Sequence, residues 1–548
     1  MKRNIHINMH IISAALTALV MLSGCGTNSA EQPVSDDTAA ASSADLTETT
    51  EEQKAVSSLS ADVSDAETNN YKIKTSGTYR FSGSSDTPIK VDADNCDVVI
   101  ILDGADITSS DSPALYVKSA ASVRVISAGG TVNSLKCTAA ADQDSTAKTT
   151  AAVWSKTDIV FDGEGSVDII SENGTGIRSK GNITFENGTA VITSRENGVS
   201  SDADISVNGG NISITAGGGH NGNDSAKGLK ADGSVVIGGG TLTVDCADDA
   251  VNAGADLTMK GGTLGISAGD DAVHADQSIT VDGGTIDVSA CYEGFEGYYI
   301  TINGGSVNIV SSDDGINAAS PESSADTFMT GSDDSFITVN GGTVNVNSNG
   351  DGFDSNGKIE LNGGNVTVAG PANSDNSAFD SDGEFVINGG NVIGIGSSMM
   401  AEAPSAGGAN VICVTASIGA GKLSVADEDG NEVFSFEAEN NYSSAVISTP
   451  DIISGKTYTV SSAGNELGTV EMTDAVGMIG EMKGFGGGFG GRPGKFGHDD
   501  LRQNGEMPSP PGDMPFDSDN MPSPPGDMPF DFGNMPDFSE NNSGSENA

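Results

Sequence analysis

The chain has 548 residues, of which 36% are hydrophobic and 74 are glycine, so its length allows one large domain or several smaller ones. Asp and Glu (77) outnumber Lys and Arg (25), and the formal net charge of −52 argues against nucleic acid and anionic membrane surfaces as direct partners. The same charge favours cations, or anionic ligands bridged by cations, although acidity also serves solubility alone.

The N-terminus carries the features of a bacterial export signal. Lys2 and Arg3 precede the apolar run IISAALTALVML (11–22), which is shorter than a transmembrane helix needs to be. The following LSGC (22–25) resembles the lipobox of bacterial lipoproteins, which implies cleavage before Cys25 and lipidation of its sulfur. We therefore expect a signal peptide over 1–25 and a disordered tether over 26–69. The mature protein would be anchored by lipid on the extracellular face of the bacterial cytoplasmic membrane.

Residues 70–390 are predicted to form a solenoid, because a glycine pair recurs at a nearly constant period. Four of the eight intervals between these pairs are 22 residues long and one is 21, while the others contain polar insertions. A period in the twenties is typical of solenoids. The second glycine of the pair, or of its variant, stands at 188, 210, 240, 262, 284, 305, 342, 364 and 390.

Apolar residues alternate with polar ones around each glycine pair. In the coil of Gly262, Leu257 and Met259 precede the pair, Leu264 and Ile266 follow it, and Val273 marks a third segment. Period-two alternation in three segments predicts three short strands per coil, and therefore an all-β parallel β-helix. The residue before the pair is often Asn, which suits a tight turn and can form an amide ladder along the helix axis. Weaker strand patterns at 96–102, 122–127, 157–162 and 166–170 predict earlier, less regular coils.

Acidic residues recur at fixed positions of these coils, so the predicted stacking places them in columns along one edge. Neighbouring coils lie ~4.8 Å apart. Like charges at that spacing repel by roughly 3 kcal/mol per pair at an effective dielectric constant near 20. Ca²⁺ would relieve this repulsion, because it takes six to eight oxygen ligands and carboxylates of adjacent coils can converge on it. A solvated acidic face is the simpler alternative. The candidate ligands are Asp248, Asp249, Asn252, Asp270, Asp271, Glu293, Glu296, Asp313, Asp314, Asn317, Asp351, Asp354 and Asp380.

Four other residues in or beside the acidic columns are candidates for ligand binding. Lys227 and Lys230 could act as a catalytic base or simply pair with the acids one coil further on. His274 could be a ligand, a sugar contact or an exposed column residue. Tyr292, together with Tyr298 and Tyr299, could stack on a sugar ring.

The C-terminal part loses the glycine period. Residues 391–480 still alternate between strands and turns, and we expect a small β module or cap that covers the open end of the helix. Residues 481–548 are rich in Gly, Met and Pro and are expected to be a disordered tail. The five cysteines beyond Cys25 are odd in number and lack a C-x-x-C pair, which predicts buried thiols rather than a disulfide framework or a zinc site.

Several segments together resemble the carbohydrate-binding domain family of cellulose- and acid-sugar-binding β-helix proteins. They are SGTYRFSG (76–83), VVIILDGADITSSDSPALYV (98–117), the NGG repeats and the DDA/DDG columns. The resemblance covers roughly 70–480 and implies a right-handed parallel β-helix with bound calcium. It also implies calcium sites similar to those of certain pectate lyases, which use D-D-x-x-D and an acid of a neighbouring coil. DDAVN (248–252), DDAVH (270–274) and DDGIN (313–317) match the paired acids and differ at the last position.

The function expected from these features is non-catalytic binding of a polysaccharide, either cellulose or an acidic sugar polymer such as polygalacturonate. Calcium on the acidic face would bridge the acidic protein to acidic sugars, and the protein would be a monomer. A calcium-dependent, pectate-type polysaccharide lyase is the first alternative, since such an enzyme needs calcium and a Lys or Arg base. A surface adhesin or spacer stiffened by calcium is the second.

Overall fold

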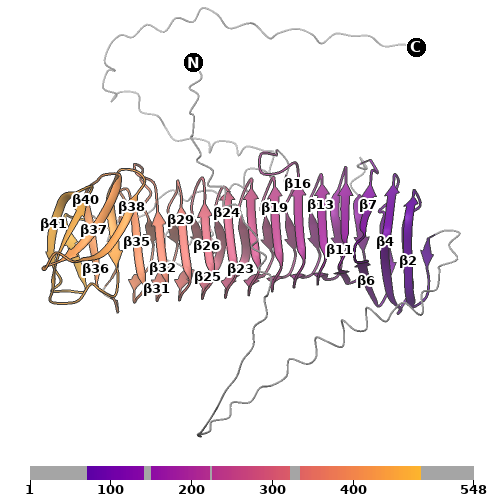
Figure 1. The fold of residues 1–548 in the computed structure, drawn as a ribbon, viewed down its shortest axis with the longest axis horizontal. Coiled ribbons are helices and arrows are strands. Elements are labelled where there is room, and N and C mark those ends of the chain that lie inside the picture. Colours follow the sequence, from indigo (N-terminus) through magenta and orange to yellow (C-terminus); the bar gives the residue numbers. More distant parts are fainter. Residues whose placement is uncertain (1–70, 141–149, 223–224, 321–333, 406, 483–548) are drawn as a thin grey trace, which may run out of the picture.

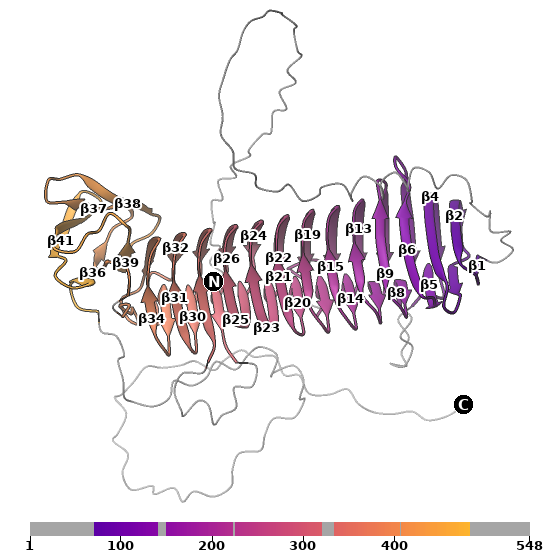
Figure 2. The same cartoon turned by 90° about the horizontal axis from the view of Figure 1, so that it is seen from below.

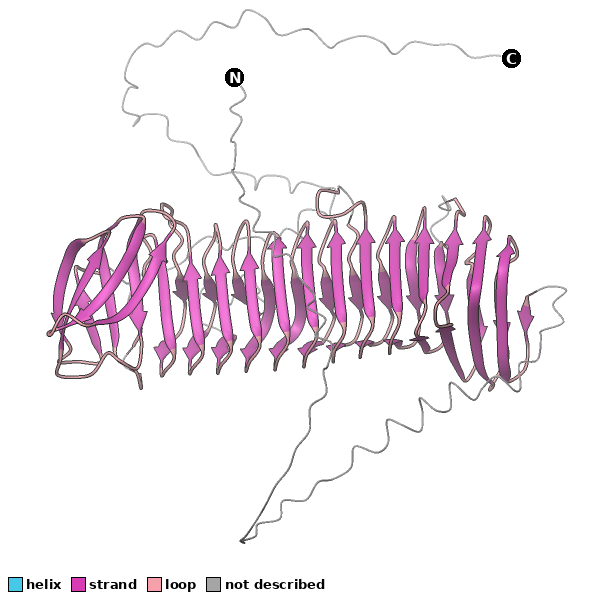
Figure 3. Cartoon of the chain, viewed as in Figure 1, coloured by secondary structure: helices cyan, strands magenta, loops and turns pink. Residues whose placement is uncertain are grey.

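The computed structural model describes residues 71–140, 150–222, 225–320, 334–405 and 407–482. The described residues form strands but no helix (Figure 3). Successive coils stack side by side into an elongated solenoid, with the last strands gathered at one end (Figure 1). The predicted signal peptide and tether, and the predicted tail from 483 onward, lie outside the described residues. Within the described residues, no helix is both long and apolar enough to cross a membrane.

Each coil contributes a strand to three parallel sheets, as the alternation predicts. We number the sheets in the order in which a coil passes through them. The first is built from the short strands such as those that begin at Val273 and Phe295. The first sheet contains β1 (Lys72–Ile73), β3 (Ile89–Asp92), β5 (Leu115–Ser119), β8 (Ala151–Ser155), β11 (Thr175–Ser179), β14 (Val199–Ser201), β17 (Leu229–Ala231), β20 (Val251–Ala253), the start of β23 (Val273–Val281), the start of β25 (Phe295–Ile302), β27 (Ile316–Ala318), β30 (Phe353–Ser355) and β33 (Phe379–Ser381).

The second and third sheets flank the glycine turn. The second sheet contains β2 (Gly77–Ser85), the start of β4 (Asp97–Ser109), β6 (Ser122–Ser127), β9 (Ile159–Gly163), β12 (Ile183–Phe185), β15 (Ile205–Val207), β18 (Val235–Ile237), β21 (Asp256–Met259), the ends of β23 and β25, β28 (Phe336–Val339), β31 (Lys358–Leu361) and β34 (Phe385–Ile387). The third contains the end of β4, β7 (Val132–Cys137), β10 (Ser166–Ser171), β13 (Thr189–Ser194), β16 (Asn211–Ala216), β19 (Thr241–Cys246), β22 (Thr263–Ala268), β24 (Thr285–Ala290), β26 (Ser306–Val310), β29 (Thr343–Asn347), β32 (Asn365–Ala369) and β35 (Asn391–Gly396).

The core is a set of apolar stacks inside the solenoid. The inward residue of each of these first-sheet strands stacks on another apolar residue in the next coil, and Val273, Phe295 and Phe353 have no exposed surface. Burial of one such column per sheet removes a continuous apolar surface from water, which is the main stabilising contribution to a solenoid. Cys137, Cys246, Cys291 and Cys413 are buried free thiols, and Cys96 is a partly exposed one.

The turn between the second and third sheets depends on glycine. Gly262 has φ +82°, and a Cβ at this position would lie 2.7 Å from the carbonyl oxygen of Gly240. Only glycine combines that backbone conformation with so close an approach of the next coil. The preceding asparagines form the amide ladder that the sequence predicts: Asn340 Nδ2 donates to Asn303 Oδ1 at 2.8 Å, and Asn362 Nδ2 donates to Asn340 Oδ1 at 2.9 Å.

The C-terminal strands leave the solenoid pattern and close its end. β35 pairs in parallel with β32 but antiparallel with β39 (Tyr442–Ser448), so the last edge of the third sheet is covered. β36 (Val411–Ile418) lies between β39 and β42 (Val476–Ile479). A separate antiparallel sheet has the order β38 (Glu432–Ala438), β37 (Gly421–Asp427), β40 (Thr457–Ser462), β41 (Asn465–Glu471), and it packs on a second core. The module lies at one end of the solenoid in Figure 2.

Candidate functional site

The acidic residues before the first sheet stack in one column, which we call the turn column. Backbone hydrogen bonds set its register: the amide that follows each member donates to the carbonyl of the member in the next coil. Gly228 N donates to Asp249 O at 2.9 Å, and Ala272 N donates to Glu293 O at 2.9 Å. The described members are Thr175, Asn197, Lys227, Asp249, Asp271, Glu293, Asp314, Asp351 and Ser377.

Side-chain oxygens in the turn column also accept hydrogen bonds from the next coil. Asp314 Oδ1 accepts from the backbone N–H of Asp351 at 2.7 Å, and Asp351 Oδ1 accepts from Ser377 N at 2.5 Å. Asp249 Oδ1 accepts from Asp271 N at 3.3 Å. These donors partly replace the water that the carboxylates lose on burial. Repetition of acids alone cannot reveal these donors, because they come from the backbone.

A second column runs along the outer surface of the first sheet, and we call it the outer column. Its register is unbroken along the solenoid, and the first-sheet strands β5, β8, β14, β20 and β23 follow one another in Figure 2. The sequence predicts it only from Ser200 onward, because the earlier coils have irregular spacing. The full column is Lys72, Lys90, Tyr116, Trp154, Arg178, Ser200, Lys230, Asn252, His274, Glu296, Asn317, Asp354 and Asp380.

Lys227 neutralises the first acidic coil. Its Nζ lies 2.9 Å from Asp248 Oδ1 and 2.5 Å from Asp249 Oδ2. Burial works against the charge on Lys227, but Asp249 and Asp248 raise the pKa of its ammonium group above the ordinary value. For Asp249, burial outweighs the attraction of Lys227 and raises the pKa of the carboxyl to about 6. Lys230 belongs to the same coil but to the outer column, and it makes no ion pair with the described residues.

His274 provides the cation of the next coil. Its Nδ1 lies 2.8 Å from Glu296 Oε2 and 3.5 Å from Asp271 Oδ2, and its Nε2 lies 3.1 Å from Asp276 Oδ1. Burial opposes protonation, but the hydrogen bonds to Asp271 and Glu296 raise the pKa of His274 to about 12. The same contact has the opposite effect on Glu296: although burial works against ionisation, His274 lowers the pKa of this carboxyl to about 2.

The coil of Glu293 brings three acids together, two of which, Asp271 and Glu296, also contact His274. Oxygens of Asp271, Glu293 and Glu296 lie within 4.8 Å of one another. Burial and the negative charge of Glu296 raise the pKa of Glu293 to about 8, and the charges of Asp314 and Asp313 act in the same direction. Asn317 Nδ2 donates to Glu293 Oε2 at 2.9 Å. Carboxylate and amide oxygens from adjacent coils are the ligands that Ca²⁺ takes, so this donor set fits calcium.

Two further groups of the described residues bring possible ligand atoms within the same 4.8 Å: Asp248, Asp249 and Asp270, and Asp249, Asp271 and His274. Like the group of Glu293, both include an acid that Lys227 or His274 contacts. Asn252 Nδ2 donates to Asp249 Oδ2 at 2.9 Å. The remaining predicted ligands form no three-acid group among the described residues: Asp314 and Asp351 stack in the turn column, Asp354 and Asp380 stack in the outer column, and Asp313 directly precedes Asp314.

The three aromatic candidates differ in exposure. Tyr292 is 38% exposed, whereas Tyr298 and Tyr299 are partly buried. The Tyr299 ring is stacked on Phe336 of the next coil with the ring centroids 4.9 Å apart, and its centroid lies 4.1 Å from that of the tilted Tyr298 ring. Tyr292 is therefore the most exposed of the three.

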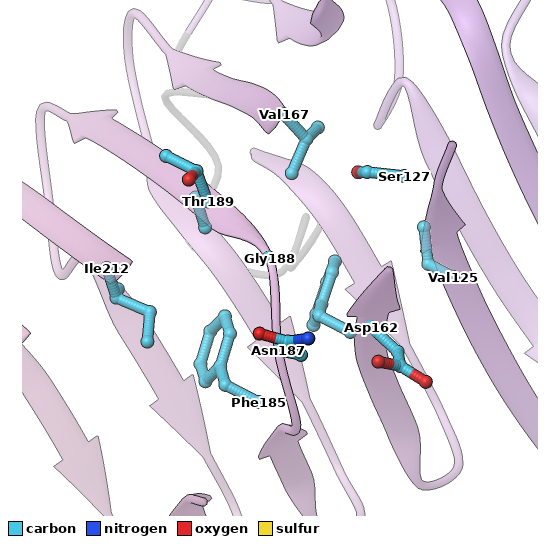
Figure 4. Close-up of a pocket in the computed structure, with 11 residues that line it drawn as sticks. Val125, Ser127, Asp162, Val167, Phe185, Asn187, Gly188, Thr189 and Ile212 are labelled. Carbon is cyan, nitrogen blue, oxygen red and sulfur yellow. The ribbon is translucent and has the colours of Figure 1, made fainter. Parts of the chain in front are cut away.

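A small pocket lies where β6, β9 and β12 approach the third sheet, beside Asp162, Phe185 and Asn187 (Figure 4). Its volume of about 10 Å³ accommodates at most one water molecule. A sugar ring does not fit there, and the columns on the outer surface remain the candidate site.

Comparison with known proteins identifies the family. The family model described as carbohydrate-binding domain-containing protein matches residues 67–222, 179–272 and 270–469. A relative of the same description from Acetivibrio thermocellus is 29% identical over 188 residues, which are 33% of this chain and 64% of the relative, so the match spans less than two thirds of that protein. A solved structure, the gadolinium derivative of the polysaccharide lyase-like protein from C. thermocellum, has 29% sequence identity and a TM-score of 0.31, covering 40% of this chain and 84% of that one. The family match extends over most of the chain, and the protein belongs to the carbohydrate-binding domain-containing family.

Proposed function

We propose that this protein is a cell-surface lipoprotein that binds polysaccharide, either cellulose or an acidic polymer such as polygalacturonate, without cleaving it. Calcium held by the acidic columns bridges the protein to the carboxylates of acidic sugars. The lipid on Cys25 anchors the protein, as a monomer, to the extracellular face of the cytoplasmic membrane; this residue lies outside the described part of the chain. The observation that carries the calcium assignment is the close group of Asp271, Glu293 and Glu296, in which Asp271 is buried and the two glutamates are partly buried.

The environment of Glu293 favours a cation in this place. A carboxyl whose pKa is raised to about 8 by burial and by neighbouring acids gains much from a divalent ion, because the ion replaces the lost hydration and offsets the repulsion. Asp271, Glu293, Glu296 and Asn317 would hold the ion, and Asp313 and Asp314 would add negative charge nearby. Bound calcium would supply an electrophilic contact for a sugar carboxylate.

The contacts of Lys227 argue against this lysine as the base of a lyase. A lyase base must be deprotonated at working pH, yet Asp248 and Asp249 hold the Lys227 ammonium group and raise its pKa. The lysine is therefore a structural cation of the turn column.

Retention on insoluble polysaccharides, with calcium and with EDTA, tests the proposal. We expect calcium-dependent retention by the full protein, loss of the calcium-dependent part in Glu293→Gln, and no loss in Glu437→Gln, a control on the exposed face of β38. Appearance of an unsaturated product that absorbs in the ultraviolet would establish the lyase alternative instead. Stabilisation by calcium without retention on any polysaccharide would establish the spacer.

A further inference from the structure

The outer column changes character along the solenoid. From Glu296 onward it contains acids and Asn317, whereas from Lys72 to Asn252 no rung carries an acid. The first half instead contains Lys72, Lys90, Arg178 and Lys230 around an aromatic pair. A basic, aromatic stretch of this length stands out in a chain of net charge −52.

The aromatic pair lies at the centre of this basic stretch. The rings of Tyr116 and Trp154 are 5.2 Å apart with an interplanar angle of 50°, and Lys156 Nζ lies 5.5 Å from the Trp154 ring. Trp154 is only 5% exposed, yet its indole N–H has no hydrogen-bond acceptor among the described residues. A buried donor without a partner is uncommon in folded proteins and indicates an acceptor that comes from water or a ligand.

Most cations of the stretch are available to a ligand. Arg178 pairs with Asp202 at 2.9 Å. In contrast, Lys72, Lys90 and Lys230 make no ion pair within the described residues. The rungs of the column repeat every ~4.8 Å. That repeat is close to the length of one pyranose unit, so a linear polymer with one carboxylate per sugar can place successive charges along it.

We propose that this basic half of the outer column binds acidic polysaccharide directly, without calcium. Uronate carboxylates pair with Lys90 and Lys230, and a sugar ring packs against Tyr116 beside the Trp154 indole. The inference rests on the proposed function and adds a second site to it. The two halves are complementary: the acidic half needs calcium to accept uronates, and the basic half does not.

Trp154 is the only tryptophan of the chain, so its fluorescence reports on this site alone. We expect hexagalacturonate in EDTA to change the tryptophan emission of the full protein, and neutral cellohexaose to leave it unchanged. Lys90→Gln should weaken the apparent affinity by roughly three- to tenfold, because one charge-assisted contact is lost. Lys260→Gln, the same change at an exposed turn after β21, should leave it unchanged.

Four results would overturn the inference: no emission change with hexagalacturonate, an equal response to cellohexaose, an equal loss of affinity in Lys260→Gln, or a response only to vesicles containing phosphatidylglycerol. The last result would assign the stretch to a lipid surface. Calcium-dependent retention on polysaccharide combined with a silent Trp154 would reject this site and leave the proposed function intact. Absence of retention in calcium would reject the proposed function itself.

Discussion

Replacement of Glu293 by glutamine separates the electrostatic cost of the buried acid from its use as a metal ligand. Gln keeps the shape and the oxygen that accepts from Asn317, and it removes the charge. The pKa of Glu293 is raised from 4.5 to about 8 in the folded protein, first by burial and then by Glu296. A carboxyl with a higher pKa in the folded state favours folding below the unfolded pKa. That contribution is lost as pH rises from 4.5 through about 8.

The size of the effect follows from the two pKa values. Their difference corresponds to on the order of 5 kcal/mol of lost stability once the pH exceeds both, and about 4 kcal/mol of this is lost between about pH 5 and about pH 9. Unfolding entropies of about 2.1 cal/mol/K per residue, applied to roughly 400 structured residues, convert this loss into about 5 °C in melting temperature. In EDTA the wild-type protein should therefore lose about 5 °C more than Glu293→Gln between about pH 5 and about pH 9.

Differential scanning fluorimetry in EDTA at several pH values measures this difference, with Glu437→Gln as the matched control. Addition of calcium at high pH should raise the melting temperature of the wild-type protein more than that of Glu293→Gln, since the ion compensates a charge that the variant lacks. Parallel pH profiles for wild type and Glu293→Gln would refute the reasoning, because they would mean that Glu293 ionises in the folded state as easily as in the unfolded chain.

Three other substitutions test the fold and its charge compensation. Lys227→Met leaves Asp249 buried without its cation and should lower the free energy of unfolding by about 3–5 kcal/mol at neutral pH, measured by thermal unfolding. Lys230→Met is the control, and an equal loss of stability in that variant would contradict the role of the Lys227 ion pairs. Phe353→Ala opens a cavity in the core column, since Phe353 has no exposed surface, and should cost about 3–5 kcal/mol; a melting temperature within one degree of wild type would argue against that packing. Gly262→Ala forces a Cβ against the Gly240 carbonyl at φ +82° and should cost at least about 1–3 kcal/mol. Gly265→Ala, whose Cβ would meet nothing nearer than 4.0 Å, should be tolerated, and equal effects of the two would show that the turn does not need glycine.

The acidic columns show where prediction from sequence is strong. The glycine period and the alternation around Leu257, Met259, Leu264 and Ile266 are sufficient for the three parallel sheets, because each strand must bury one face and stack on its like in the next coil. The same register places Asp249, Asp271 and Glu293 in one column. Strand pairing determines which residues stack, so a regular repeat in the sequence is sufficient to predict this column.

Only the tertiary structure decides how these charges are compensated. Lys227 reaches across to Asp248 and Asp249, His274 bridges Asp271 and Glu296, and backbone amides of the next coil occupy carboxylate oxygens. These contacts depend on side-chain reach and burial, which have no period in the sequence.

The basic half of the outer column is a second feature that required the structure. Tyr116, Trp154 and Arg178 are unevenly spaced along the chain, because insertions of different length separate their strands. The strands on either side of these insertions pair in the same register as those of the regular coils. The sequence by itself therefore determined the fold and the acidic part of the turn column, because the repeat that sets the strands also sets which acids stack. The three-dimensional pairing alone placed Tyr116, Trp154 and Arg178 in the outer column, because their spacing along the sequence is irregular.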